Sequence, residues 1–175
     1  QTLLARVLER IKPQVGPILL NANGNPERFQ TYGLPVVADV VTGFAGPLAG
    51  ILTGLRWTKE NAGSCHWMVS VPTDAPFIPT DLVSSLMSGV EDNGGELACA
   101  VSRGRTHPVV GIWPVALADA LERALVDEGI RKIDRWTARY RLVEVEFPAD
   151  NVDPFFNANC LEDLAEAERL LPLER

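Results

Sequence analysis

Apolar residues near the start of the chain recur at the spacing of an amphipathic helix. One face of a helix over residues 2–12 carries five of them: Leu3, Leu4, Val7, Leu8 and Ile11. The same spacing, together with proline and glycine boundaries, predicts further helices. They cover residues 26–33, 48–57, 82–90 and 114–129, a short stretch around Ile133 and Trp136, and a final amphipathic segment over 161–171.

Short apolar runs separate these helices and are typical of buried strands. The predicted strands are 17–20, 35–39, 66–71, 96–102, 108–113 and 141–147, with a polar turn at 103–107 between the fourth and fifth. The last strand alternates apolar and polar residues, which indicates a half-exposed position. Strands that alternate with helices predict an α/β fold, with a mostly parallel sheet between two helical layers. Without a repeat or linker, we expect one domain over residues 1–175.

Polar residues end the first three predicted strands. Asn21, Asp39 and Asp74 each follow an apolar run, and prolines flank Asp74 on both sides. Open α/β sheets bind ligands beyond the carboxyl ends of their strands, so these three side chains should share one rim. A carboxylate at the end of a buried strand is costly unless it is paired or binds a metal. We therefore expect Asp74 to belong to a site.

Charge and composition narrow the classes of partner. The 175-residue chain has a net charge of −7 and a pI near 4.8, which disfavours nonspecific binding to nucleic acid or an anionic membrane. The three cysteines are far apart and odd in number, as expected of buried thiols in a reducing cytoplasm. The apolar runs are too short to span a bilayer. The acidic charge does not exclude an anionic small molecule as a ligand, because a site can be locally basic or use a metal. The cysteines and the short apolar runs predict a cytoplasmic protein.

The N-terminus departs from the order of a doubly wound nucleotide fold. Such folds place a strand and a Gly-rich phosphate loop before the first helix, whereas this chain opens on the helix itself. The later Gly-rich stretch "GPLAG" precedes a helix but lacks the spacing and lysine of a Walker A motif. We therefore expect a domain that is N-terminally incomplete.

Five stretches in order along the chain resemble the molybdenum cofactor guanylyltransferase family. They are "LLNAN" at 19–23, "VVAD" into "GPLAGI" over 36–51, "VPTDAPFIP" at 71–79, "HPVVGIW" at 107–113 and "FFNANCLEDL" at 155–164. The resemblance covers nearly the whole chain. It implies a Rossmann-like nucleotidyltransferase fold with three layers, α/β/α, whose first strand and Gly-rich phosphate loop are missing from this chain.

The resemblance also implies a role for individual residues. Asp74 would be the catalytic residue that holds Mg2+. Asn21, Asp39, Gly46, Pro47 and Asp74 would bind the nucleotide, and Gly50, His107, Asn157 and Asn159 would lie on the molybdopterin side. Local structural roles remain open beside these: turns or caps for Asp39, Asp74 and the asparagines, helix initiation for Gly46 and Pro47, and a structural turn for His107. Arg103 and Arg105 either bind phosphate or form a solvated hairpin tip.

The function implied is transfer of GMP from GTP to molybdopterin with release of pyrophosphate. Phosphoryl chemistry of this kind depends on positioning and charge neutralisation, usually with Mg2+. GTP and molybdopterin would be the substrates, with molybdoenzymes or their chaperones as further partners of a monomer or weak oligomer. Two alternatives stay open: a cytidylyltransferase that acts on the same pterin, and a degenerate domain that binds the cofactor without catalysis.

Overall fold

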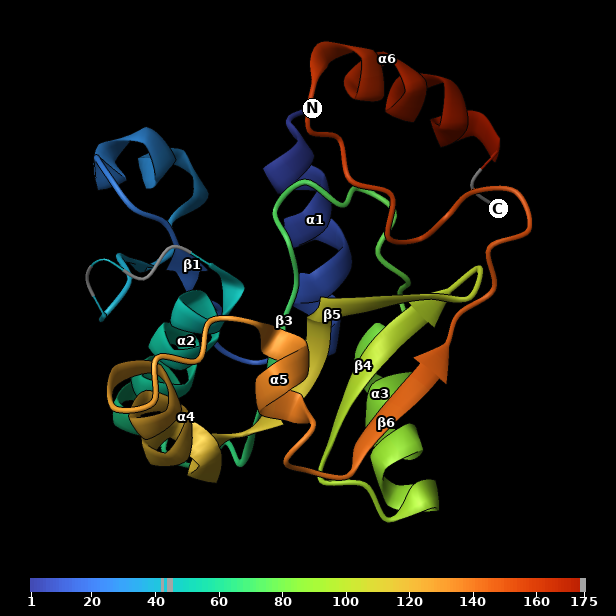
Figure 1. Ribbon diagram of the computed structural model, residues 1–175. Helices are drawn as coiled ribbons and strands as arrows, with labels where there is room; N and C mark the ends of the chain where they lie inside the picture. The colour runs from blue at the N-terminus through green and yellow to red at the C-terminus, as the bar shows by residue number, and fades with distance from the viewer. Residues whose placement is uncertain (42, 44–45, 174–175) are drawn as a thin grey trace.

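The computed structural model describes residues 1–41, 43 and 46–173 (Figure 1). The Gly-rich loop expected before the helix at 48–57 therefore falls partly outside the described residues, at 42, 44 and 45. The helices are α1 (Leu3–Ile11), α2 (Pro47–Asn61), α3 (Leu82–Asn93), α4 (Ala118–Val126), α5 (Ile133–Thr137) and α6 (Leu161–Leu170). The strands are β1 (Leu20–Asn21), β2 (Val36–Val37), β3 (Trp67–Ser70), β4 (Leu97–Ser102), β5 (Arg105–Pro114) and β6 (Leu142–Glu146).

The strands form two hydrogen-bonded groups. A four-stranded sheet has the order β3-β5-β4-β6, and β1 pairs with β2 in a separate parallel pair. Within the larger sheet β4 and β6 are parallel, while β5 runs antiparallel to both of its neighbours. The reversal follows from the hairpin that joins β4 directly to β5, because a tight turn can only connect antiparallel strands. The expected α/β class is confirmed.

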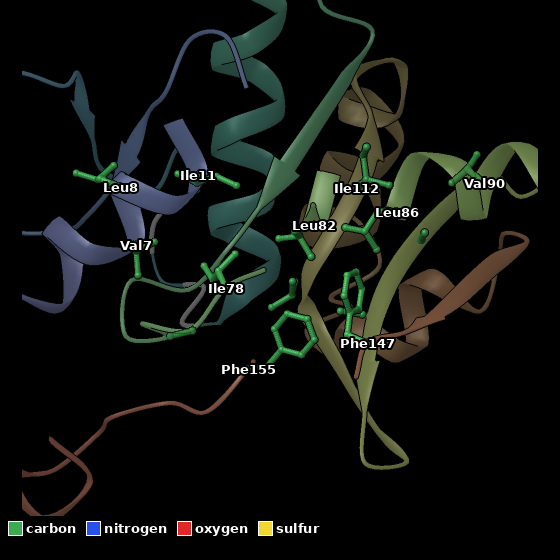
Figure 2. Packing of buried hydrophobic residues seen from close by; sticks show 14 residues of the cluster. Val7, Leu8, Ile11, Ile78, Leu82, Leu86, Val90, Ile112, Phe147 and Phe155 are labelled. Carbon is green, nitrogen blue, oxygen red and sulfur yellow. The ribbon is translucent and has the colours of Figure 1, made fainter. Parts of the chain in front are cut away.

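Side chains alternate across the sheet and supply two cores. Ala98 and Ile112 face a cluster formed with α1 and α3, whereas their neighbours Leu97 and Trp113 face a cluster formed with α2, α4 and α5. Figure 2 shows the first cluster, in which Leu82 and Leu86 of α3 lie near Ile112, and Val7 and Ile11 of α1 lie near Ile78. The helices therefore cover both faces of the sheet, as the three-layer prediction requires.

Several element boundaries differ from those expected; the strand expected at 17–20, for example, is only Leu20–Asn21. Two of the differences have a local cause. The turn between β4 and β5 is shorter than 103–107, because Arg103 and Gly104 both have positive φ, 50° and 69°, and β5 begins at Arg105. Two such residues in succession match the twist of a tight hairpin. The helix expected over 114–129 begins only at Ala118, because Pro114 still belongs to β5 and a 3-10 turn, Val115–Leu117, intervenes.

A gap separates β1 from β3. In the described part of the chain, β1 pairs only with β2 and β3 pairs only with β5, so each has an edge without a strand neighbour. Residues of both strands line one cavity of about 540 Å3. Within the described residues, no helix combines the length and hydrophobicity needed to cross a membrane.

Candidate active site

The three expected strand-end residues share one cavity. Asn21 ends β1, Asp39 lies two residues after β2, and Asp74 lies four residues after β3. All three line the cavity of about 540 Å3, and so do Gly46, Pro47 and Gly50 at the start of α2. Six of the candidate residues, from four segments of the chain, therefore line the same cavity. Their individual roles stay predictions.

Amide groups hold the Asp39 carboxylate on both sides. Asn21 Nδ2 donates to Asp39 Oδ1 at 3.0 Å and to the Val37 carbonyl at 3.1 Å. Asn23 Nδ2 donates to Asp39 Oδ2 at 2.9 Å, and its own Oδ1 accepts from the Asp39 backbone at 3.0 Å. Each carboxylate oxygen keeps further acceptor capacity, because a carboxylate offers about four lone-pair sites. The network thus orients an acceptor group at the cavity.

Gly50 makes this arrangement sterically possible. A Cβ at position 50 would lie 2.6 Å from Asn21 Oδ1, far inside van der Waals contact. Helix α2 is also fixed to the loop after β2, because the buried Thr53 hydroxyl donates to the Ala49 carbonyl at 2.8 Å and accepts from the Val40 amide at 3.1 Å. The start of α2 and the Asp39 loop therefore form one rigid wall.

Asp74 lies in a proline-flanked loop that is held in place by α1 and by the 3-10 turn after it, Lys12–Gln14. Arg6 Nε donates to the Pro76 carbonyl at 3.0 Å, Gln14 Nε2 donates to the Pro79 carbonyl at 2.8 Å, and Arg10 bonds the Ile78 carbonyl. The Arg6 guanidinium also lies 5.8 Å from the centre of the Phe77 ring. These contacts order a segment that the prolines keep out of helix and strand.

The Asp74 carboxylate suits a hard cation whose other ligands come mainly from a bound substrate and from water. Asp74 is partly exposed, and none of the described residues donates a hydrogen bond to its carboxylate. Among the described residues there is no cluster of three histidine, cysteine or acidic side chains that would form an all-protein cage. Mg2+ commonly takes only one or two carboxylates and completes its shell with phosphates and water. The residues present therefore suit Mg2+ bound together with a nucleotide.

Asn157 and Asn159 do not line the cavity, but their segment contacts the Asp74 loop. The amide of Ala158 donates to the Asp74 carbonyl at 2.9 Å, so the two exposed asparagines flank this contact. The alternative role of Asn159 as a helix cap is wrong. Helix α6 is capped by Cys160 in a capping box, in which Asp163 accepts from the Cys160 backbone.

His107 also lies outside the cavity and is engaged by the protein itself. Its Nε2 lies 2.8 Å from Ser102 Oγ, and its ring centre lies 4.8 Å from that of Phe155. Burial lowers the pKa of His107 below its ordinary value, against the opposing effect of Asp153. At the hairpin tip, Arg103 donates to the Ala149 carbonyl through Nε and Nη2 at 3.1 and 2.8 Å. The roles of Arg103 and Arg105 toward phosphate stay predictions.

Three polar residues that matter here were not anticipated. Thr53 fixes the wall beside Asp39, while Ser102 and Asp153 connect His107 to the segment that carries Asn157. Thr53 and Ser102 stand within apolar runs, where sequence alone does not distinguish a buried hydroxyl from a tolerated one. Asp153 precedes a proline, a signal of an Asx turn that was available in the sequence.

Comparisons with known proteins agree with this geometry. The MobA-like NTP transferase domain family matches residues 1–143. The molybdenum cofactor guanylyltransferases of Nitrobacter hamburgensis and a Bradyrhizobium species are each 54% identical over 99% of this chain, which covers 83% and 82% of their lengths.

Solved structures share the fold. The molybdopterin-guanine dinucleotide biosynthesis protein A of Archaeoglobus fulgidus superposes with a TM-score of 0.73 at 23% identity, over 99% of this chain and 87% of that one. The 2-C-methyl-D-erythritol 4-phosphate cytidylyltransferase of Thermus thermophilus gives 0.70 at 19% identity, over 98% and 90%. The fold is thus the Rossmann-like α/β fold of nucleotidyltransferases. At 54% identity over nearly its whole length, the chain belongs to the molybdenum cofactor guanylyltransferases, a family of nucleotidyltransferase enzymes.

Proposed function

We propose that this protein transfers GMP from GTP to molybdopterin and releases pyrophosphate, with Mg2+ as its metal. The observation that carries the proposal is the convergence of Asn21, Asp39 and Asp74 on one cavity. It occurs in a chain that is 54% identical to enzymes named for this reaction. That name favours the guanylyl reaction over a cytidylyl one, and the intact polar network argues against a degenerate binding domain.

The wall of the cavity that is formed by the Asp39 loop and the start of α2 is suited to the nucleoside. Asp39 is a hydrogen-bond acceptor for a ribose hydroxyl or for the edge of guanine, and Asn21 and Asn23 hold it in position. Gly46 and Pro47 begin α2 without a long side chain, which lets a ligand approach the backbone. The N-terminal end of this helix also favours a negatively charged group.

Asp74 is the proposed metal ligand in the same cavity. When bound there, Mg2+ would neutralise charge on the phosphates as the bond to the leaving pyrophosphate breaks. The contacts of α1 and of the Lys12–Gln14 turn with the carbonyls of residues 76–79 hold the Asp74 loop in place. The carboxylate is therefore already positioned when the substrate arrives.

The acceptor approaches from the side of Asn157 and Asn159 in this proposal. The terminal phosphate of molybdopterin is already ionised at neutral pH and attacks the α-phosphate of GTP in line. A general base is therefore not required, and the protein mainly has to position the two phosphates. We further propose that residues 1–175 act as one domain, as a monomer or weak oligomer in the cytoplasm, which passes its product to molybdoenzymes or their chaperones.

The test follows the transfer of the radiolabelled α-phosphate of GTP to molybdopterin. We expect label in the product with the unchanged protein and at least about a hundredfold slower transfer with Asp74→Ala. Asp92→Asn removes an exposed carboxylate on α3 and serves as the matched control with unchanged transfer. Transfer at a normal rate by Asp74→Ala would refute the metal assignment, and absence of labelled product with the unchanged protein would refute the function.

A further inference from the structure

A buried serine joins two segments that are distant in sequence. Ser102, at the end of β4, has a fully buried side chain. Its Oγ lies 2.8 Å from His107 Nε2 and 2.8 Å from Asp153 Oδ1. Between Cys99 and Ala100 the register of β4 against β5 shifts, and this bulge sets His107 opposite Ala100. Bulges of this kind re-aim side chains, here toward Ser102.

The hydrogen bonds in this cluster have a defined direction. An ionised carboxylate only accepts, so the Ser102 hydroxyl donates to Asp153. Ser102 has no second proton, and its oxygen therefore accepts from a proton on His107 Nε2. This tautomer is assigned from the hydrogen-bond network. The result is a chain of donors that runs from His107 through Ser102 to Asp153.

Asp153 shapes the segment that carries the two asparagines. Its Oδ1 also accepts from the Phe155 amide at 3.0 Å, and its carbonyl accepts from the Phe156 amide at 3.1 Å. The ring of Phe155 lies against His107 and, edge to face, against Phe147 with ring centres 5.3 Å apart. Figure 2 shows Phe155 entering the core beside Phe147 and Ile78. The segment is thus anchored immediately before Asn157.

The same segment reaches Asp74 on its other side. The Ala158 amide bonds the Asp74 carbonyl at 2.9 Å, and the rings of Phe156 and Phe77 lie 6.3 Å apart. Figure 1 shows the chain after β6 running back to the loop that follows β3. Residues 153–158 therefore connect the β4–β5 hairpin to the proposed metal loop.

We propose that Ser102, His107 and Asp153 are positioning residues that lock residues 155–159 against the Asp74 loop and thereby place Asn157 and Asn159 for the acceptor substrate. This deepens, and rests on, the proposed transferase function. In this proposal His107 acts through Ser102 and Asp153. We assign the cluster to the acceptor side because the segment that it anchors carries Asn157 and Asn159.

The first test measures backbone order in the folded protein by 15N relaxation. We expect Asp153→Ala to lower the order parameters of residues 155–159 from about 0.85 to below about 0.6, while α4 stays rigid. Asp153→Asn keeps an oxygen that accepts from both partners and should preserve the order. Ser102→Ala, which is nearly isosteric, should loosen the same segment and covers the case in which Asp153→Ala does not fold. Unchanged order at 155–159 in both alanine variants overturns the proposal.

The second test separates the two substrates. With Asp153→Ala or Ser102→Ala, the KM for molybdopterin should rise at least about tenfold while the KM for GTP stays within about twofold. Asp153→Asn should leave the KM for molybdopterin close to that of the unchanged protein. An equal rise in both constants, or no rise in either, contradicts an acceptor-side role. If the unchanged chain transfers no GMP, the proposed function fails, and the relaxation experiment still decides whether the cluster locks the segment.

Discussion

Substitution of Gly50 by alanine tests how closely α2 fits Asn21. The new Cβ would lie 2.6 Å from Asn21 Oδ1, so the Asn21 side chain has to rotate away. Rotation breaks its hydrogen bonds to the Val37 carbonyl and to Asp39. Each such bond contributes about 0.5–1.5 kcal/mol, so the loss is about 1–3 kcal/mol.

The helix itself gains from the same substitution. Position 50 lies inside α2, where alanine is more favourable than glycine by about 1 kcal/mol. The net change in the free energy of unfolding should therefore be a loss of roughly 0–2 kcal/mol. GTP binding should weaken as well, because Asp39 loses the amide that orients it.

A double-mutant cycle with Asn21→Ala isolates the steric contact. In the Asn21→Ala background the clash is gone, so Gly50→Ala should stabilise the protein by about 1 kcal/mol. The coupling between the two positions, measured by urea unfolding, should be about 1–3 kcal/mol. A coupling below about 0.5 kcal/mol would refute the reasoning, because Gly50 and Asn21 would then act independently.

Two further predictions concern titrating groups. Burial, helped by the charge of Glu144, raises the pKa of the Cys99 thiol to about 12, so at pH 8 an alkylating reagent should modify the exposed Cys160 and reach Cys99 only after unfolding. Mass spectrometry distinguishes the sites, and equal native labelling would contradict the burial. Burial also lowers the pKa of His107, so the unfolded chain takes up a proton first and stability should fall as pH drops below about 6.5. The dependence of the free energy of unfolding on pH, measured by urea unfolding between pH 8 and 5, should be weaker in His107→Gln. An unchanged pH dependence would contradict the lowered pKa of His107.

The strand ends were predictable because they depend on a regular rule. Alternating strands and helices place carboxyl ends at one edge, and this brought Asn21, Asp39 and Asp74 together without knowledge of side-chain geometry. The family resemblance added Gly46, Pro47 and Gly50, and the structure lines the same cavity with them. Why position 50 needs glycine became clear only from the distance to Asn21.

Contacts between distant segments were not predictable in the same way. Ser102 and Asp153 are 51 positions apart, and nothing local in either segment indicates their pairing. Cys160 takes the N-cap position that had been an alternative role for Asn159, because Asp163 accepts from the Cys160 backbone and completes a capping box there. Strand β5 begins earlier than expected, at Arg105, because Arg103 and Gly104 both have positive φ. Arginine rarely adopts that conformation, so the sequence did not indicate it.

The most direct test of the central claim is an NMR titration of the 15N-labelled chain with GTP and Mg2+, with CTP as the competing nucleotide. Chemical-shift mapping detects even weak binding and reports where it occurs. The account predicts that GTP perturbs the amides of Asn21, Asp39 and Gly50 more strongly than CTP does, and that Asp74→Ala removes the Mg2+ dependence. Perturbations that avoid this cavity, or that do not distinguish GTP from CTP, would contradict it.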